Sequence, residues 1–303
     1  MALYGWVGDT LWVSDASTRR TTLISPGRTL VRTFRWPIAV HSTNEKDAEA
    51  VRLMTVIPRG MLVDGSLLVL SYLSSRERMP AWAKRAGDEM SWAVRTSPDG
   101  DFKNVVVGLP TVESCNVTGS LENGGQWGLP VPFCARPHWS IASDGTRIVL
   151  SAQPAGTTRN SATYSVTSVS STGDTVFSRQ FTYTPTAIAQ RVADSTRAAF
   201  RANVARQFPP AAVRAVEEMR LPSLYPAIKS VVAGRDATTW LERWTPPGDH
   251  LWHVLDASGN LVGALTLPVN VTLHTASRDG IWAVEKDDDG LESVVRYRIT
   301  RPR

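Results

Sequence analysis

The histidines are the first residues in this sequence to examine for chemistry, because imidazole serves both as a metal ligand and as a general base. Of the five histidines, His250 and His253 lie closest together, in the segment "DHLWH". In a β-strand, residues three apart point to opposite faces of the sheet. This spacing therefore argues against a metal site shared by the two rings.

A stronger group lies in the segment "ARPHWS", where Arg136, His138 and Trp139 stand at the start of a predicted strand. A guanidinium, an imidazole and an indole ring together offer a ligand hydrogen-bond donors and an apolar surface. The alternative is structural: Trp139 belongs to the hydrophobic core, and His138 hydrogen-bonds to a neighbouring backbone group. We take the three as candidate ligand-binding residues.

The acidic segment "EKDDDGLE" places Glu285, Asp287, Asp289 and Gly290 at the first ligand positions of a calcium-binding loop. Such a loop needs a bidentate carboxylate at its twelfth position. Here that position is Arg296. The segment therefore predicts a hairpin turn rather than an ion site.

Other motifs that carry chemistry are missing from the sequence. It contains no glycine-rich phosphate-binding motif, no G-x-S-x-G nucleophile elbow and no H-E-x-x-H zinc motif. We therefore expect no catalytic residue, no metal ligand and no cofactor, and the sequence favours a protein that is not an enzyme.

The two cysteines, Cys115 and Cys134, are 19 residues apart and lie within a segment rich in glycine and proline, residues 111–136. This spacing is not that of a C-x-x-C zinc or redox pair. Two cysteines in one loop close a disulfide in an oxidising compartment, or they remain two inert thiols. The sequence leaves both alternatives open.

Composition narrows the class of partner. The net charge is +5 and the isoelectric point about 9.5, but the basic residues are interleaved with acids and form no basic run. We therefore expect no nucleic-acid partner. No apolar run reaches the roughly 20 residues of a membrane-spanning helix, and the segment "MALYGWVGDTLW" lacks the features of a signal peptide.

A repeated unit is the strongest structural signal. Short Asp/Gly turns precede β-rich runs in "VGDTLWVSDAS", "VDGSLLVLSYL", "SDGTRIVLSAQ", "GRDATTWLERW" and "SRDGIWAVEKD". Each unit reads as a strand, a turn and further strands, four in all, except the fifth, residues 270–300, which has three. Four-stranded units that repeat every 40–60 residues or so are typical of β-propeller blades. We expect one all-β propeller domain over residues 1–303, with about five blades present.

Three segments interrupt the repeat. Residues 75–90 predict a charged loop or short helix, and residues 111–136 a loop insertion that carries the cysteines. Residues 187–221 predict a helical insertion, with Asp194 or Ser195 as N-cap and Phe200, Val204 and Phe208 on one face. Pro209 and Pro210 end the first helix, and Pro210 begins a second. The insertion either packs on one face of the propeller or covers the mouth of its channel.

The repeated segments, together with "PFCARPHWSIASDG" and "LPSLYPAIKSVVAGRDATTWL", resemble bacterial six-bladed β-propellers of the NHL-repeat and TolB-like group. The resemblance covers nearly the whole chain. It implies that an N-terminal blade and the strand that closes the last blade are missing here; a genuine five-bladed ring is the alternative. It also implies a periplasmic or extracellular location, if the full-length gene carries an export signal.

The function that we expect is binding. A rigid propeller presents loops and a channel mouth to a partner, and the resemblance implies that "HWSIA" is an innermost strand, so that Arg136, His138 and Trp139 lie at the mouth. We predict a non-catalytic scaffold for a protein, peptide or glycan. The alternative is a lactonase-like or other propeller hydrolase acting at the axial channel, but the predicted inner strands contain no carboxylate.

Overall fold

The structure, a computed structural model, describes most of the chain. The described residues are 2–7, 9–15, 17–36, 57–72, 91–109, 115–121, 124–153, 162–245 and 248–300. The predicted loop or short helix at 75–90 lies outside them. Within the described residues, no helix has the length and hydropathy needed to cross a membrane.

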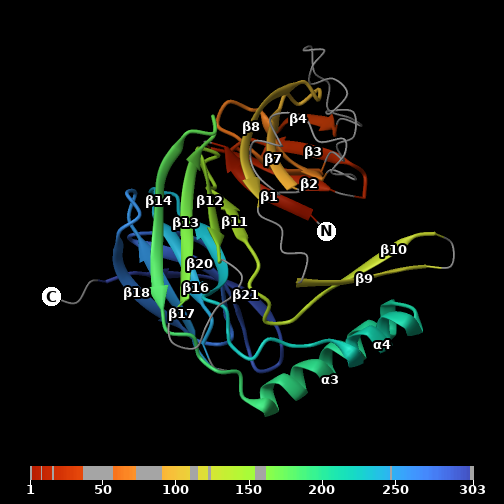
Figure 1. Cartoon of the computed structure of the whole chain (residues 1–303). Helices are drawn as coiled ribbons and strands as arrows, with labels where there is room; N and C mark the ends of the chain where they lie inside the picture. The colour runs from red at the N-terminus through yellow and green to blue at the C-terminus, as the bar shows by residue number, and fades with distance from the viewer. Residues whose placement is uncertain are drawn as a thin grey trace.

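The fold is an all-β propeller of five antiparallel blades with a small helical insert, which confirms the predicted fold class (Figure 1). Blade 1 comprises β1 (Ala2–Val7), β2 (Thr10–Asp15), β3 (Arg20–Ile24) and β4 (Leu30–Arg35). Blade 2 comprises β5 (Ile57–Met61), β6 (Leu67–Tyr72), β7 (Ser91–Thr96) and β8 (Phe102–Leu109). In both blades the strands follow one another in chain order across the sheet.

The remaining blades have the same meander topology. Blade 3 comprises β11 (His138–Ile141), β12 (Arg147–Ala152), β13 (Ala162–Ser170) and β14 (Thr175–Tyr183). Blade 4 comprises β15 (Ile228–Ala233), β16 (Thr239–Arg243), β17 (His250–Leu255) and β18 (Leu261–Leu267). Blade 5 has only three strands, as the sequence predicted: β19 (Val271–Ser277), β20 (Gly280–Lys286) and β21 (Glu292–Arg298).

The turns that open blades 2 and 3 are built by an aspartate two residues before a serine or threonine. Asp64 Oδ1 accepts a hydrogen bond from the backbone N–H of Ser66 at 3.1 Å, and Asp144 Oδ1 accepts one from Thr146 at 3.0 Å. The glycine between each pair has a positive φ, as an Asx turn of this kind favours. The predicted Asp-Gly turns of blades 2 and 3 are therefore confirmed.

The hydrophobic core lies between the blades rather than within any one of them. Because side chains alternate across a strand, Leu67 and Val69 of β6 pack towards blade 1, and Leu68 and Leu70 pack towards blade 3. Further clusters join blade 3 to blade 4 and blade 4 to blade 5. No cluster of the described residues joins blade 5 to blade 1, and a sixth blade between them stays a prediction.

The segment that carries the cysteines is more regular than predicted. Within residues 111–136 the structure has a two-stranded hairpin, β9 (Asn116–Ser120) and β10 (Gln126–Pro130), instead of an irregular loop. A disulfide joins Cys115 to Cys134 at the base of this hairpin. The hairpin forms because its alternate residues, Trp127 and Leu129 among them, are buried by the helices of the next insertion.

Two helices occupy the region predicted to be helical, α3 (Gln190–Gln207) and α4 (Pro210–Glu218). The prediction that α4 begins at Pro210 is confirmed, but the predicted N-cap of α3 at Asp194 or Ser195 is wrong, because Ala189 is the N-cap. A β-bridge between Ala187 and Leu224 holds the chain just before the helix, so tertiary structure sets where it begins.

The helices pack against the hairpin. Val204 of α3 and Val216 of α4 are buried together with Trp127 and Leu129, with Phe200 and Phe208 partly buried beside them, as their spacing predicted. Figure 1 shows α3, α4, β9 and β10 together, extending to one side of the blades.

Candidate functional site

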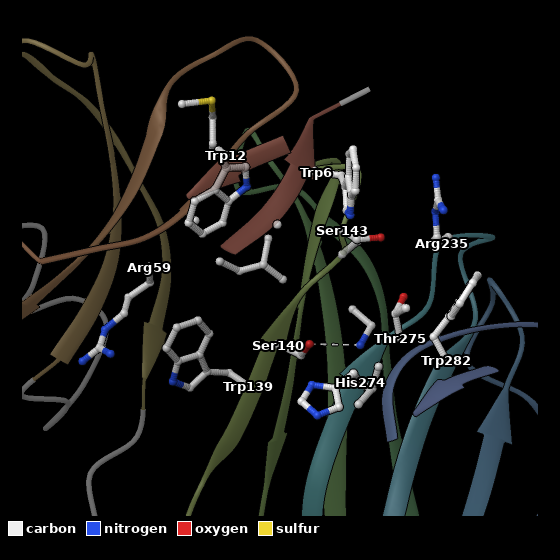
Figure 2. Close-up of a pocket in the computed structure, with 17 residues that line it drawn as sticks. Trp6, Trp12, Arg59, Trp139, Ser140, Ser143, Arg235, His274, Thr275 and Trp282 are labelled. Carbon is white, nitrogen blue, oxygen red and sulfur yellow. Dashed lines mark hydrogen bonds between the residues drawn. The ribbon is translucent and has the colours of Figure 1, made fainter. Parts of the chain in front are cut away.

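A cavity of about 690 Å³ lies where the five innermost strands meet (Figure 2). These strands, β1, β5, β11, β15 and β19, each contribute residues to its wall. Inner strands of neighbouring blades lie side by side, β1 with β5, β11 with β15 and β15 with β19, so the cavity follows from the blade arrangement. Neither helix contributes to the wall.

Four tryptophans line the cavity: Trp6, Trp12, Trp139 and Trp282. Trp12 is buried, and its indole takes the space that a side chain at Gly5 would fill, since a Cβ there would lie 2.8 Å from the ring. Trp6 and Trp282, by contrast, remain 41% and 44% exposed. Large aromatic surfaces left open in a cavity are typical of ligand sites.

Polar groups enter the cavity from three blades. Ser140 Oγ accepts a hydrogen bond from the backbone N–H of Ala233 at 3.1 Å, which ties blade 3 to blade 4 (Figure 2). Ser143 Oγ and Thr275 Oγ1 are buried and have no hydrogen-bond partner among the described residues. His274, next to Thr275, is exposed to the cavity. A buried hydroxyl without a partner needs an explanation, and one explanation is a ligand.

The charges on the wall have one sign. Arg59 and Arg235 line the cavity, and no aspartate or glutamate of the described residues does. The described residues contain no group of three or more His, Cys, Asp or Glu side chains that could hold a metal ion. The wall therefore presents hydrogen-bond donors and aromatic surface, and among the described residues His274 is its one side chain suited to acid–base chemistry.

Of the three candidate residues from the sequence, the structure brings only Trp139 to the cavity. The guanidinium of Arg136 donates instead to the carbonyl of Cys115, and also to Asn116 Oδ1 at 3.4 Å, towards the hairpin. Burial lowers the pKa of His138, and nearby Arg136 lowers it further, while the backbone of Ile228 and the carboxylate of Glu242 oppose the shift. A role for Arg136 and His138 in ligand binding stays a prediction.

The residues that sequence reasoning missed are Arg59, Arg235, His274 and Trp282. His274 and Arg59 lie on innermost strands, so alternation along those strands was a signal that could have found them. Arg235 lies just beyond β15, and Trp282 on β20, next to an innermost strand. Nothing local marks those two as cavity residues.

Glu242 is the centre of a second polar cluster, in blade 4. Its Oε1 lies 2.7 Å from Lys229 Nζ and 2.6 Å from His250 Nδ1, and Oε2 accepts a hydrogen bond from Ser230 Oγ at 2.7 Å. Burial raises the pKa of Glu242, but the bonds from Lys229, Ser230 and His250 outweigh it and lower the pKa overall. Because both carboxylate oxygens are occupied and Ser230 donates to the acid rather than to a base, the cluster is structural.

A smaller cavity of about 220 Å³ lies between blades 3 and 4, and His253 is part of its wall. As the spacing predicted, His253 and His250 do not face a common site. The other notable group there is Arg243, whose guanidinium carbon lies 5.3 Å and 5.2 Å from the ring centroids of Tyr164 and Tyr183. Arg243 Nε also donates to the carbonyl of Ala227 at 3.0 Å, so this arginine is held by the fold.

The fold places this protein in the class of β-propellers. No family model matches the chain, and no curated protein matches it. Solved structures that are similar include a member of the DUF4221 family from Bacteroides vulgatus, at 10% identity and a TM-score of 0.43, over 96% of this chain and 76% of that one.

Two further solved structures are similar at lower TM-scores. One is a streptogramin B lyase, at 10% identity and a TM-score of 0.29, over 99% of this chain and 69% of that one. The other is BamB from Moraxella catarrhalis, at 12% identity and a TM-score of 0.28, over 95% and 70%. Similarity at this level assigns neither a family nor an activity, and membership of the NHL-repeat or TolB-like group stays a prediction.

Proposed function

We propose that this protein is a non-catalytic β-propeller scaffold whose axial cavity receives part of a protein, peptide or glycan partner. The observation that carries the proposal is the composition of the cavity wall. It combines four tryptophans with arginine, histidine and hydroxyl donors, and the volume of about 690 Å³ falls within the range of roughly 300–1,000 Å³ that is usual for ligand pockets.

The alternative, a hydrolase acting at the same channel, has less support. General acid–base chemistry and metal-assisted hydrolysis both need carboxylates or other ligands that converge on the reacting atoms. Among the described residues the cavity wall has no carboxylate, its one imidazole is that of His274, and the carboxylate of Glu242 is already engaged by three neighbours. A calcium titration followed by thermal melting separates the two functions, since clear stabilisation by the ion would favour the hydrolase.

The scaffold proposal is tested by filling the cavity. His274→Trp places an indole in the cavity from an exposed position on β19, without disturbing a buried side chain. The matched control is Thr182→Trp, which adds the same ring at an exposed position of the outer strand β14. Peptide and glycan arrays are probed with the wild type and both variants.

The expected result is a set of array partners retained by Thr182→Trp and lost with His274→Trp. Circular dichroism and thermal melting establish that both variants fold. If the partners of the wild type are retained by folded His274→Trp, the axial cavity is not the binding site. If arrays of both kinds show no partner, the scaffold proposal loses its support.

We also propose that the protein works outside the cytoplasm. The disulfide between Cys115 and Cys134 supports this location, because disulfides form and persist in oxidising compartments. Fractionation of the native host, with detection of the protein in the periplasm or medium, tests the location. Recovery in the cytoplasmic fraction alone would contradict it.

A further inference from the structure

The charged residues of the cavity wall indicate the charge of the ligand. Arg59 and Arg235 bring two permanent positive charges to the wall, and no carboxylate among the described residues lining it balances them. Neither arginine forms an ion pair with another described residue. Arginine is well suited to bind oxyanions, because its planar fork of N–H donors matches the oxygens of carboxylate and phosphate groups.

The neutral polar groups of the wall favour the same kind of ligand. Ser143 Oγ and Thr275 Oγ1 are buried without partners among the described residues, and each can donate a hydrogen bond. They come from blades 3 and 5, and both residues line the cavity shown in Figure 2. A ligand oxygen placed between the blades would satisfy donors that the fold leaves unused.

The aromatic residues indicate the shape of the rest of the ligand. Trp6 and Trp282 are among the most exposed tryptophan surfaces described, and both face the cavity. Flat indole rings favour a flat apolar partner, through area burial and offset or edge-to-face stacking. The same wall also contains Ile141 and Met61, which add further apolar surface.

We infer that the axial cavity binds an oxyanion, such as a carboxylate, carried on a planar apolar group. The inference rests on the proposed function and names the chemical class of the ligand. The ligand group is either a free aromatic acid or the carboxyl end of a peptide with a terminal aromatic residue. Arg235 and the two free hydroxyls bind the oxyanion, and the tryptophans contact the ring.

Isothermal titration calorimetry with matched probes tests the inference. The free acid is 2-naphthoate, and its uncharged counterpart is 2-naphthalenemethanol. The peptide arm uses N-acetyl-Gly-Phe with a free carboxylate and the same peptide as its C-terminal amide. We expect each acid to bind about tenfold more tightly than its uncharged counterpart, the ratio typical of a charge-assisted hydrogen bond.

Three variants complete the test. Arg235→Gln is expected to reduce the preference for the acid to about threefold or less, and Arg179→Gln, on the exposed face of β14, to leave it unchanged. Trp282→Ser is expected to weaken the binding of the acid and of the alcohol equally, because it removes a contact with the ring and leaves the charges unchanged. Whichever acid binds more tightly, 2-naphthoate or the peptide, identifies the source of the ligand, and either source supports the inference.

Equal binding of the acids and their uncharged counterparts overturns the inference, as does an acid preference that survives Arg235→Gln in full. Absence of binding by both acids overturns it as well. None of these results removes the scaffold proposal, which depends on the array experiment with His274→Trp. If His274→Trp loses the array partners and the acid and the alcohol bind equally well, the cavity is still the binding site but has no preference for a negatively charged ligand.

Discussion

A single glycine in the turn that opens blade 3 is predicted to be essential to the contact between blades 2 and 3. Gly145 has a φ of +68°, and an added Cβ would lie 2.7 Å from the carbonyl oxygen of Met61 and 2.7 Å from the backbone nitrogen of Val63. Gly145 also accepts a hydrogen bond from Val63 N–H at 3.2 Å. The backbones of two blades therefore meet at this glycine.

The chain offers a matched control in the equivalent turn of blade 2. Gly65 has a φ of +79°, and no atom lies within 4 Å of the position of its added Cβ. Gly65→Ala therefore introduces only the strain of a left-handed alanine, about 1 kcal/mol. Gly145→Ala adds the cost of overpacking against backbone that cannot rotate away, a further 1–3 kcal/mol or so.

We expect Gly65→Ala to lower the free energy of unfolding by about 1 kcal/mol and Gly145→Ala by about 3 kcal/mol. Urea unfolding followed by circular dichroism measures both, and in thermal melts each kcal/mol corresponds to roughly 2–4 °C for a chain of this size. Equal losses in the two variants would refute the reasoning, because they would show that the close approach to blade 2 has no energetic effect.

Three further predictions follow from the structure. Thiol titration of the denatured protein should find no free thiol, and two titrating thiols would contradict the disulfide. Replacing Cys115 and Cys134 together by serine should lower the free energy of unfolding by about 3 kcal/mol, because a crosslink between residues 19 apart is lost. Arg147 is 7% exposed and donates to the carbonyls of Gly234 and Thr238. Arg147→Met should therefore lower the free energy of unfolding, measured in urea, by about 1–3 kcal/mol for each carbonyl left unpaired. The pKa of Glu242 is lowered in the folded protein, so its stabilisation is complete above the unfolded pKa near 4.5 and is lost as pH falls through the folded pKa. Urea midpoints from pH 7 to pH 3 should therefore fall more steeply for the wild type than for Glu242→Gln, and parallel curves would contradict the linkage.

Much of the fold was predictable because it depends on residues close together in the chain. The Asp-Gly turns require a positive φ that glycine adopts without strain, and this marks the hairpins from sequence alone. The segment "VDGSLLVLSYL" predicts a turn followed by a strand, and the structure has β6 there, with Leu67 and Leu68 buried against different blades. The three-stranded fifth blade also followed from counting strands.

The errors came where distant residues override local preference. Asp194 and Ser195 are good N-cap residues, but the bridge between Ala187 and Leu224 starts α3 earlier. The segment around Trp127 reads as a loop because its glycines and prolines favour turns, yet it pairs as a hairpin when α3 and α4 cover it. Contacts with a distant segment decided both cases, backbone pairing for α3 and burial for the hairpin.

The candidate site, like the fold, was predicted from the sequence only in part. The sequence by itself predicted inner strands without carboxylates, and it identified Trp139. Only the tertiary structure decided which side chains share the cavity, because Ser140 and Ala233, which meet through a hydrogen bond in its wall, are 93 residues apart. Alternation and turn chemistry act over a few residues and specify blades, whereas the contents of the cavity depend on how separate blades pack around an axis, which no local pattern encodes.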